Sequence, residues 1–168
     1  MSALPLRLWI AGQGGQGISF MAQLLCRALS HEQKFAISRS DPEWGIRGGH
    51  VVASVLMDTQ RINLSEAKNY NALIYLHPSV RNFKPPQSED ALCIDAYEAG
   101  LLQQARALNF EQGLNLLALG VLLAHIPCCQ PNSIVWQLKR MLGRDAIAAW
   151  PANVALFEQG LNDGNRLK

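Results

Sequence analysis

The sequence predicts an α/β fold with three α/β/α layers, built on a mainly parallel, mixed sheet. Short apolar runs alternate with amphipathic helical segments, a pattern typical of parallel strands that are joined by crossover helices. The first apolar run leads into a glycine-rich loop and then a helix, which together predict a Rossmann-like βα unit. Helical periodicity dominates the C-terminal part of the chain.

Strands are expected where short apolar runs end in glycine, proline or polar residues. The runs that fit this description are 6–11, 35–38, 50–57, 72–76 and 91–94. Residues 58–60 are expected to turn the third strand back onto 61–64, a hairpin that adds an antiparallel member to the sheet. The stretches 39–49 and 81–90 are polar and contain proline, so they are expected to be surface loops.

Helices are expected where apolar residues recur at helical spacing. The segment 18–29 carries Ile18, Met21 and Leu25 on one face, which indicates an amphipathic helix packed on the sheet. Further helices are predicted at 101–108, 111–125, 132–142 and 145–159. Pro131 and Pro151 lie where the first turn of a helix accepts proline.

Composition indicates one globular domain spanning residues 1–168. The chain is 49% hydrophobic and 17% charged, and its net charge of +2 comes without a basic run, so no nucleic-acid partner is expected. The N-terminus lacks the pattern of a signal peptide and no apolar run is long enough to span a bilayer. We therefore expect a cytoplasmic protein without a membrane anchor.

The four cysteines, Cys26, Cys93, Cys128 and Cys129, form no C-x-x-C pair. The chain alone is therefore expected to hold neither a zinc site nor an iron–sulfur cluster, and no metal ligand is predicted. His31, His77 and His125 have no ligand spacing to a second metal-binding residue, so they are expected to be structural or surface residues.

The glycine loop places glycines at the three positions of G-x-G-x-x-G, between a predicted strand and a predicted helix. The first glycine allows a tight turn, the second a close approach to the backbone, and the third close helix–strand packing. The free N–H groups at the helix start attract an anion.

However, a dinucleotide site needs an acidic residue at the end of the second strand, and Asp41 is expected to lie just beyond it. Three roles remain open: dinucleotide binding, a purely structural turn, and contact with an anion or cofactor phosphate presented by another chain.

The loop after the second strand contains Arg47, Gly48 and Gly49, followed by His50. The carboxyl ends of parallel strands share one edge of a sheet, so this loop and the glycine loop are expected to be neighbours. Arg47 has two interpretations of equal weight. In the first, its planar guanidinium binds a carboxylate or phosphate through two N–H donors. In the second, it hydrogen-bonds the backbone of its own loop.

A strand followed by G-x-G-G-Q-G-I and then an R-G-G element that opens an apolar strand is more specific than either motif alone. This combination resembles the gamma subunit of the 2-oxoacid:ferredoxin oxidoreductases, the pyruvate/ketoisovalerate oxidoreductase catalytic domain that is also the small subunit of indolepyruvate oxidoreductase. A helix that contains Asn115 and ends in Leu-Gly at Gly120 adds to the resemblance, as does an N-x-x-x-F-x-x-G segment at 153–160. The similarity covers residues 8–160.

One loop departs from the family pattern. Many relatives have a Tyr-Gly-Pro-Glu-type run that leads directly to R-G-G, whereas this chain has Trp44, Gly45 and Ile46 between Glu43 and Arg47. The position of Gly45 is closer to the indolepyruvate-type loop.

The resemblance implies a complex that oxidatively decarboxylates a 2-oxoacid of the pyruvate, ketoisovalerate, 2-oxoglutarate or indolepyruvate class to acyl-CoA. Thiamine diphosphate, Mg and iron–sulfur clusters carry the chemistry in such complexes, with coenzyme A as acceptor of the acyl group. This chain has neither a G-D-G…N element for thiamine diphosphate nor a cluster-binding cysteine pattern. The resemblance therefore implies a gamma subunit without catalytic residues of its own. Its expected partners are the thiamine-binding alpha and beta subunits, and ferredoxin indirectly.

The resemblance also implies that the two loops face this subunit interface, near the route of coenzyme A. Gln13 and Gln16 are candidates to hydrogen-bond a partner backbone or a coenzyme A phosphate. The candidate cofactor-binding residues are Gly12, Gln13, Gly14, Gly15, Gln16, Gly17, Arg47, Gly48, Gly49 and His50. The alternative function is a stand-alone nucleotide- or CoA-binding regulatory module that reuses the fold.

Overall fold

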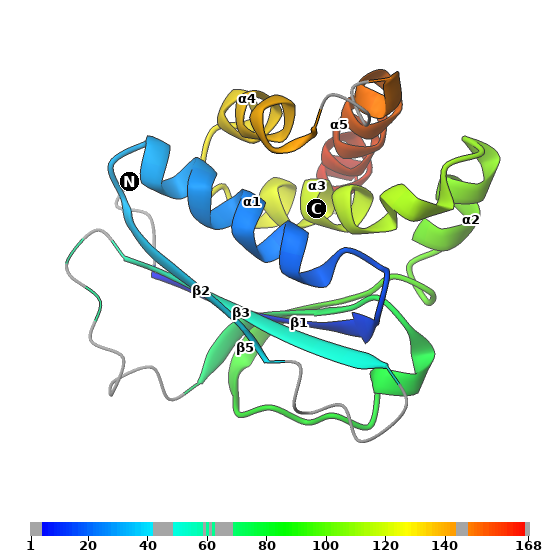
Figure 1. Cartoon of the computed structure of the whole chain (residues 1–168). Coiled ribbons are helices and arrows are strands. Elements are labelled where there is room, and N and C mark those ends of the chain that lie inside the picture. The colour runs from blue at the N-terminus through cyan, green and yellow to red at the C-terminus, as the bar shows by residue number, and fades with distance from the viewer. Residues whose placement is uncertain are drawn as a thin grey trace.

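A computed structural model describes residues 5–41, 49–58, 60, 62, 69–143 and 148–166. Its strands form one sheet in the order β2-β3-β1-β4-β5 (Figure 1). The strands are β1 (Leu6–Gln13), β2 (Phe35–Asp41), β3 (His50–Asp58), β4 (Tyr70–Tyr75) and β5 (Gln87–Asp95). β4 runs parallel to both β1 and β5, whereas β3 is antiparallel to both β1 and β2. The predicted mixed, mainly parallel sheet is confirmed.

The antiparallel member of the sheet is β3, which lies between β1 and β2. Its register pairs Phe35 with Asp58 and Asp41 with Val52. Only residues 42–49 connect β2 to β3, and so short a connection favours antiparallel pairing because a parallel crossover needs a dozen residues or more. The predicted hairpin onto 61–64 lies almost entirely outside the described residues.

The helices follow the predicted order. They are α1 (Ile18–His31), α2 (Leu101–Ala107), α3 (Leu114–His125), α4 (Pro131–Met141) and α5 (Trp150–Arg166), with short 3-10 helices η3 (Pro78–Val80) and η4 (Glu111–Gly113). Several boundaries differ from the sequence prediction: β1 extends to Gln13, β2 extends to Asp41, and the helix predicted at 111–125 is divided into η4 and α3. β5 begins at Gln87, because polar residues are well tolerated at a sheet edge. α5 extends to Arg166 instead of ending at 159.

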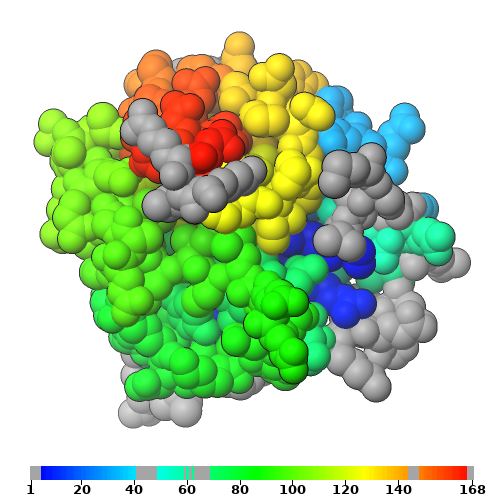
Figure 2. All heavy atoms as spheres, turned by 180° about the vertical axis from the view of Figure 1, so that it is seen from behind, coloured from blue at the N-terminus to red at the C-terminus, as the bar shows by residue number. Residues whose placement is uncertain are grey.

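The two faces of the sheet are covered in different ways. Leu6, Leu8 and Ile10 of β1 point into the main core with the helices, which lie on one side of the sheet in Figure 1. Trp9 and Ala11 point to the other face, into a smaller cluster with Val80 of η3. The expected helical layer on this second face is not seen among the described residues. The reason is that the β4–β5 connection crosses it as η3 and a loop, which Figure 2 shows in green from behind.

α3 is the central helix, and every residue from Leu114 to Ala124 is buried. Its crossing with α5 depends on glycine. A Cβ on Gly120 would collide with the backbone oxygen of Phe157, and one on Gly160 would collide with that of Leu117. Within the part of the chain that is described, no helix combines the length and the apolar character that crossing a membrane requires.

Replacing Gly120 with alanine is expected to lower the free energy of unfolding by about 1–3 kcal/mol or more, because the new methyl group forces the two helix backbones apart. Gly143→Ala is the matched control, since a Cβ there meets no atom within 4 Å. Chemical denaturation of both variants measures the difference. Equal stability of the two would contradict the close crossing.

Candidate functional site

The glycine loop joins β1 to α1 at the carboxyl edge of the parallel strands. Gly15 has a φ of 88°, and Gly17, the N-cap residue of α1, has a φ of 71°. Both values lie in the left-handed region that side chains disfavour. The backbone itself therefore favours glycine at these two positions, independently of any ligand.

The side chain of Gln16 holds the loop in place. Its Oε1 accepts the backbone N–H of Gln13 at 2.7 Å, and its Nε2 donates to the carbonyl oxygen of Leu76 at 2.9 Å. Gly12 leaves the room for this arrangement, because a Cβ there would lie 2.6 Å from Gln16 Oε1. One amide thus connects the end of β1 to the residue that follows β4.

The other side of the loop rests on α3. Asn115 is 5% exposed, and its Nδ2 donates to the carbonyl oxygen of Gly17 at 3.2 Å. A Cβ on Gly17 would collide with the Asn115 amide. The sequence singled out Asn115 only as part of a family pattern, and its contact across 98 positions in the chain carries no local signal.

The start of α1 is suited to an anion. No side chain caps it, and its first turn contains no acidic residue, so its N–H groups retain the partial positive charge of a helix N-terminus. Gly14 and Gly15 are exposed. A pocket of about 330 Å³ adjoins the loop, lined by Gly15, Gln16, Leu102, Glu111, Gln112 and Leu114.

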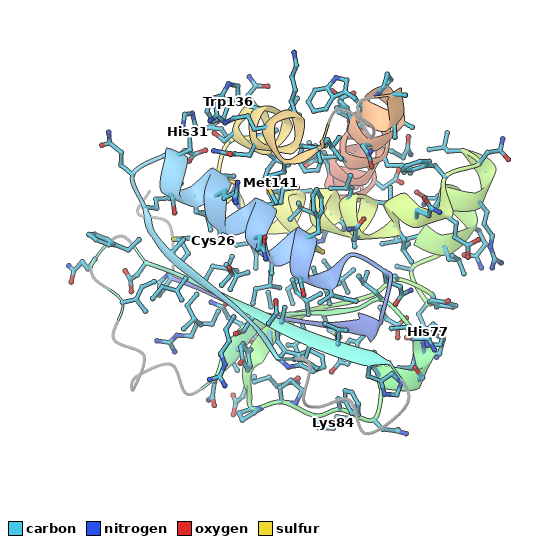
Figure 3. All side chains as sticks on the ribbon, viewed as in Figure 1. Cys26, His31, His77, Lys84, Trp136 and Met141 are labelled. Carbon is cyan, nitrogen blue, oxygen red and sulfur yellow. The ribbon has the colours of Figure 1, made fainter. Side chains whose placement is uncertain are left out.

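A larger hollow of about 630 Å³ lies on the face of the sheet that η3 and its loop cross, with Trp9 and Lys84 in its wall. Figure 3 labels Lys84 on the loop that passes below the sheet. We place the candidate site at the glycine loop instead, because the helix start and the converging polar groups lie there.

The second predicted loop approaches the first as expected. The N–H of Gly14 donates to the carbonyl oxygen of Gly49, and His50 lies opposite Gln13 in the β1–β3 register. Gly49 has a φ of 71°. Arg47 and Gly48 lie outside the described residues, so the fork predicted for Arg47 stays a prediction.

Two histidines and a serine lie beside these loops. His50 Nε2 is 2.9 Å from Ser79 Oγ, and His77 Nδ1 is 2.7 Å from the same oxygen. The ring of His77 lies edge-on to Tyr97, and the ring of His50 lies edge-on to Phe83. Sequence reasoning singled out only His50, because the η3 turn that brings His77 and Ser79 to it has no motif of its own.

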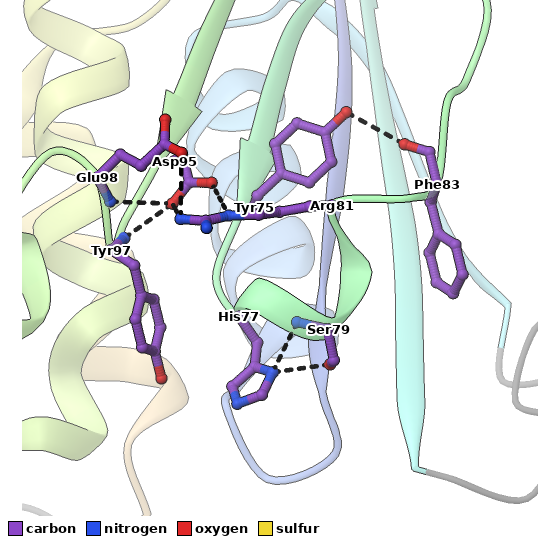
Figure 4. Close-up of polar contacts among 8 residues, drawn as sticks. All are labelled: Tyr75, His77, Ser79, Arg81, Phe83, Asp95, Tyr97 and Glu98. Carbon is purple, nitrogen blue, oxygen red and sulfur yellow. Dashed lines mark hydrogen bonds and ion pairs between the residues drawn. The ribbon is translucent and has the colours of Figure 1, made fainter.

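A charged cluster fixes the η3 turn against β5 (Figure 4). Arg81 donates from Nε and Nη2 to the carboxylate of Asp95, at 2.6 and 2.9 Å. The backbone N–H groups of Tyr97 and Glu98 donate to Asp95 Oδ1. Burial opposes ionisation of Asp95, but these hydrogen bonds and the Arg81 charge hold the pKa of its carboxyl below the usual value.

The geometry argues against a dinucleotide site, for a reason other than the predicted one. Asp41 was expected beyond the second strand, but β2 extends to it. The strand-end acid is therefore present. Because β3 lies between β1 and β2, that residue is about 10 Å from β1, whereas in a dinucleotide fold the second strand lies beside the first.

The described residues contain no group of three or more His, Cys, Asp or Glu side chains placed to hold a metal ion. Cys128 and Cys129 are buried. A hydrogen bond between the two thiols lowers the pKa of Cys128 and raises that of Cys129. His31 stacks on Trp136 with ring centroids 4.4 Å apart, and Nδ1 of His125 lies 3.2 Å from the carbonyl oxygen of Val121 in its own helix.

Comparison with known proteins gives consistent matches over nearly all of the chain. The family model described as pyruvate ferredoxin/flavodoxin oxidoreductase matches residues 7–162. The 2-oxoglutarate synthase subunit KorC of Archaeoglobus fulgidus is 25% identical, over 94% of this chain and 87% of the relative.

Solved structures share the fold at lower identity. The gamma subunit of keto/oxoacid ferredoxin oxidoreductase from Geobacter sulfurreducens matches with a TM-score of 0.81 at 17% identity, over 96% of this chain and 97% of that one. The 2-oxoglutarate:ferredoxin oxidoreductase of Magnetococcus marinus, solved with 2-oxoglutarate, coenzyme A and succinyl-CoA bound, matches with a TM-score of 0.79 at 16% identity. That match covers 98% of this chain and 32% of the longer chain.

Replacing Gln16 with alanine is expected to lower the free energy of unfolding by about 1–3 kcal/mol, since it leaves the Gln13 N–H and the Leu76 carbonyl without their partner. Gln13→Ala keeps its backbone N–H and is the control. Thermal or urea unfolding of both variants tests this. A Gln16 variant as stable as the Gln13 variant would show that the amide does not support the loop.

Proposed function

Because this chain belongs to the pyruvate ferredoxin/flavodoxin oxidoreductase family, we propose that it is the gamma subunit of a cytoplasmic 2-oxoacid:ferredoxin oxidoreductase complex. The complex would oxidatively decarboxylate a 2-oxoacid to an acyl-CoA and pass the electrons to an iron–sulfur acceptor. In this proposal the glycine loop and the neighbouring Gly49–His50 segment form one wall of a site that other subunits complete.

Two comparisons support a role in a larger assembly. The same fold occurs as a separate gamma subunit in the Geobacter protein. It also occurs as about a third of a much longer chain in the Magnetococcus oxidoreductase. A unit found both separate and fused is suited to assemble with the domains that flank it in the fused chain.

The positions of the cysteines in this chain agree with the proposal that other subunits hold the iron–sulfur clusters. Its cysteines lie apart on α1, on β5 and in the α3–α4 connection, and only Cys128 and Cys129 are neighbours. An iron–sulfur cluster needs four such ligands together, so the proposal assigns the clusters and thiamine diphosphate to the other subunits. Those groups supply the decarboxylation and electron-transfer chemistry when bound.

The main support for the proposal is the conformation of the glycine loop. Gln16 and Asn115 hold it from inside the fold, while a Cβ on Gly15 would meet no atom within 4 Å. A loop that is fixed from within and open outside can take a partner backbone or a phosphate group of coenzyme A close to its own backbone.

Co-expression with the genes that flank its own is expected to yield a complex of this chain with larger, thiamine-binding subunits. Co-purification, followed by analysis of thiamine diphosphate, iron and 2-oxoacid-dependent reduction of ferredoxin, measures this. If the chain remains alone while the other subunits form a fully active enzyme, the proposal is wrong.

Gly15→Asn is expected to separate folding from assembly. Asparagine tolerates the left-handed backbone better than most residues, so the chain stays folded, while the added side chain fills the space where a partner or ligand docks. We expect an at least tenfold loss of complex formation or of coenzyme A-dependent activity, about 1.4 kcal/mol. Gly143→Asn, also in open space, is the matched control. Unchanged assembly and activity in Gly15→Asn would argue against a functional loop.

A further inference from the structure

Two histidine rings meet at one serine hydroxyl beside the glycine loop. His50 starts β3 opposite Gln13, while His77 and Ser79 lie at the start of η3, as Figure 4 shows. Ser79 is exposed, and both histidines are partly exposed. The three side chains therefore face a place that a ligand can reach.

The hydrogen bonds among them have a fixed direction. The backbone N–H of Ser79 donates to His77 Nδ1 at 3.2 Å, so Nδ1 carries a lone pair and no proton. The hydroxyl of Ser79 must then also donate to Nδ1, and its oxygen accepts the Nε2–H of His50. The chain runs from His50 through Ser79 to His77.

This direction assigns different roles to the two rings. His77 carries its proton on Nε2, outside the chain, and a second proton on Nδ1 would break both bonds from Ser79. Burial, together with the neighbouring His50, lowers the pKa of His77. The Nε2–H of His77 is therefore a donor that the chain leaves unused, while the His50 ring is held by its bond to Ser79.

Arg81, which follows η3, is the centre of a charged cluster with Asp95 and Glu98. Arg81 and Asp95 neutralise each other through two hydrogen bonds, and Glu98 lies 3.5 Å from Arg81. The uncharged neighbours are the rings of Phe83 and Tyr97. Arg81 is therefore committed to its carboxylates, which leaves the imidazoles to receive an anion.

We propose that His50, Ser79 and His77 form a binding subsite for a phosphate oxyanion at the rim of the glycine loop. The subsite offers the Nε2–H of His77 as a donor, and the residues before His50 and His77 contact the loop that leads to the uncapped start of α1, so both features favour a negative ligand. That this rim faces a ligand in the assembled enzyme rests on the proposed function, whereas the binding itself belongs to this chain.

Histidine NMR of the full chain tests the subsite. The chain has four histidines, so single His→Gln variants assign each ring signal. Inorganic phosphate, added against chloride of equal ionic strength, is expected to give saturable shifts of the His50 and His77 signals. The His31 and His125 signals should not move. Figure 3 shows His31 and His77 at opposite ends of the molecule.

Variants distinguish phosphate binding at this subsite from non-specific electrostatic attraction of phosphate to the protein. Ser79→Ala should weaken phosphate binding about fivefold, since it releases both rings, while Ser79→Thr keeps the hydroxyl and should retain it. A fivefold weakening corresponds to a loss of about 1 kcal/mol of binding free energy. His77→Gln should weaken binding as well, and His31→Gln is its matched control.

The source of the phosphate is resolved by a second titration with coenzyme A. Tighter binding of coenzyme A than of inorganic phosphate, at the same two rings, supports a phosphorylated cofactor as the ligand, and weaker binding supports free phosphate. No saturable shift of His50 and His77 with either ligand would overturn the proposal. Because this measurement needs no partner subunit, its failure is distinct from a failure of the chain to assemble.

Discussion

The side-chain amide of Gln16 is the contact on which the arrangement of the carboxyl edge depends. It connects the backbone of Gln13, at the end of β1, to the carbonyl of Leu76, directly after β4. Those two strands are parallel neighbours, so one amide sets how the glycine loop and the η3 turn leave the sheet. A side chain at position 12 would displace this amide, since a Cβ on Gly12 would lie 2.6 Å from Gln16 Oε1.

The insertion of β3 between β1 and β2 determines what this edge presents. In a fold with neighbouring parallel strands, the end of β2 would lie beside the glycine loop and supply an acid for a ribose. Here the N-terminal end of β3 takes that place and brings Gly49 and His50 against Gly14 and Gln13. Backbone amides and an imidazole consequently stand beside the glycine loop at the place where a dinucleotide fold has its carboxylate, which favours an anionic ligand group there.

Local patterns were sufficient to predict most of the fold, because strand, loop and helix signals agree between residues 6 and 31. They could not predict the strand order, since nothing local in 50–57 distinguishes an edge strand from one inserted beside β1. The second layer of helices was predicted from the α/β class and is replaced by η3, a three-residue turn without periodicity.

In the site, the positions of Gly12 to Gly17 and the approach of Gly49 could be predicted from motifs. Asn115, His77 and Ser79 could not, because their contacts join distant parts of the chain.

A subunit without catalytic chemistry can still contribute to a reaction by fixing dipoles before the ligand arrives. The loop is held from below by Gln16 and Asn115, and the rings of His50 and His77 are held by a shared hydroxyl. Groups that need no rearrangement on binding lose little of their interaction energy to reorganisation. The asymmetric covering of the sheet reinforces this, since the helices pack on one face and leave the carboxyl edge open. The fold therefore supplies a preorganised loop, which suits the proposed role of a subunit whose partners would carry the reactive groups.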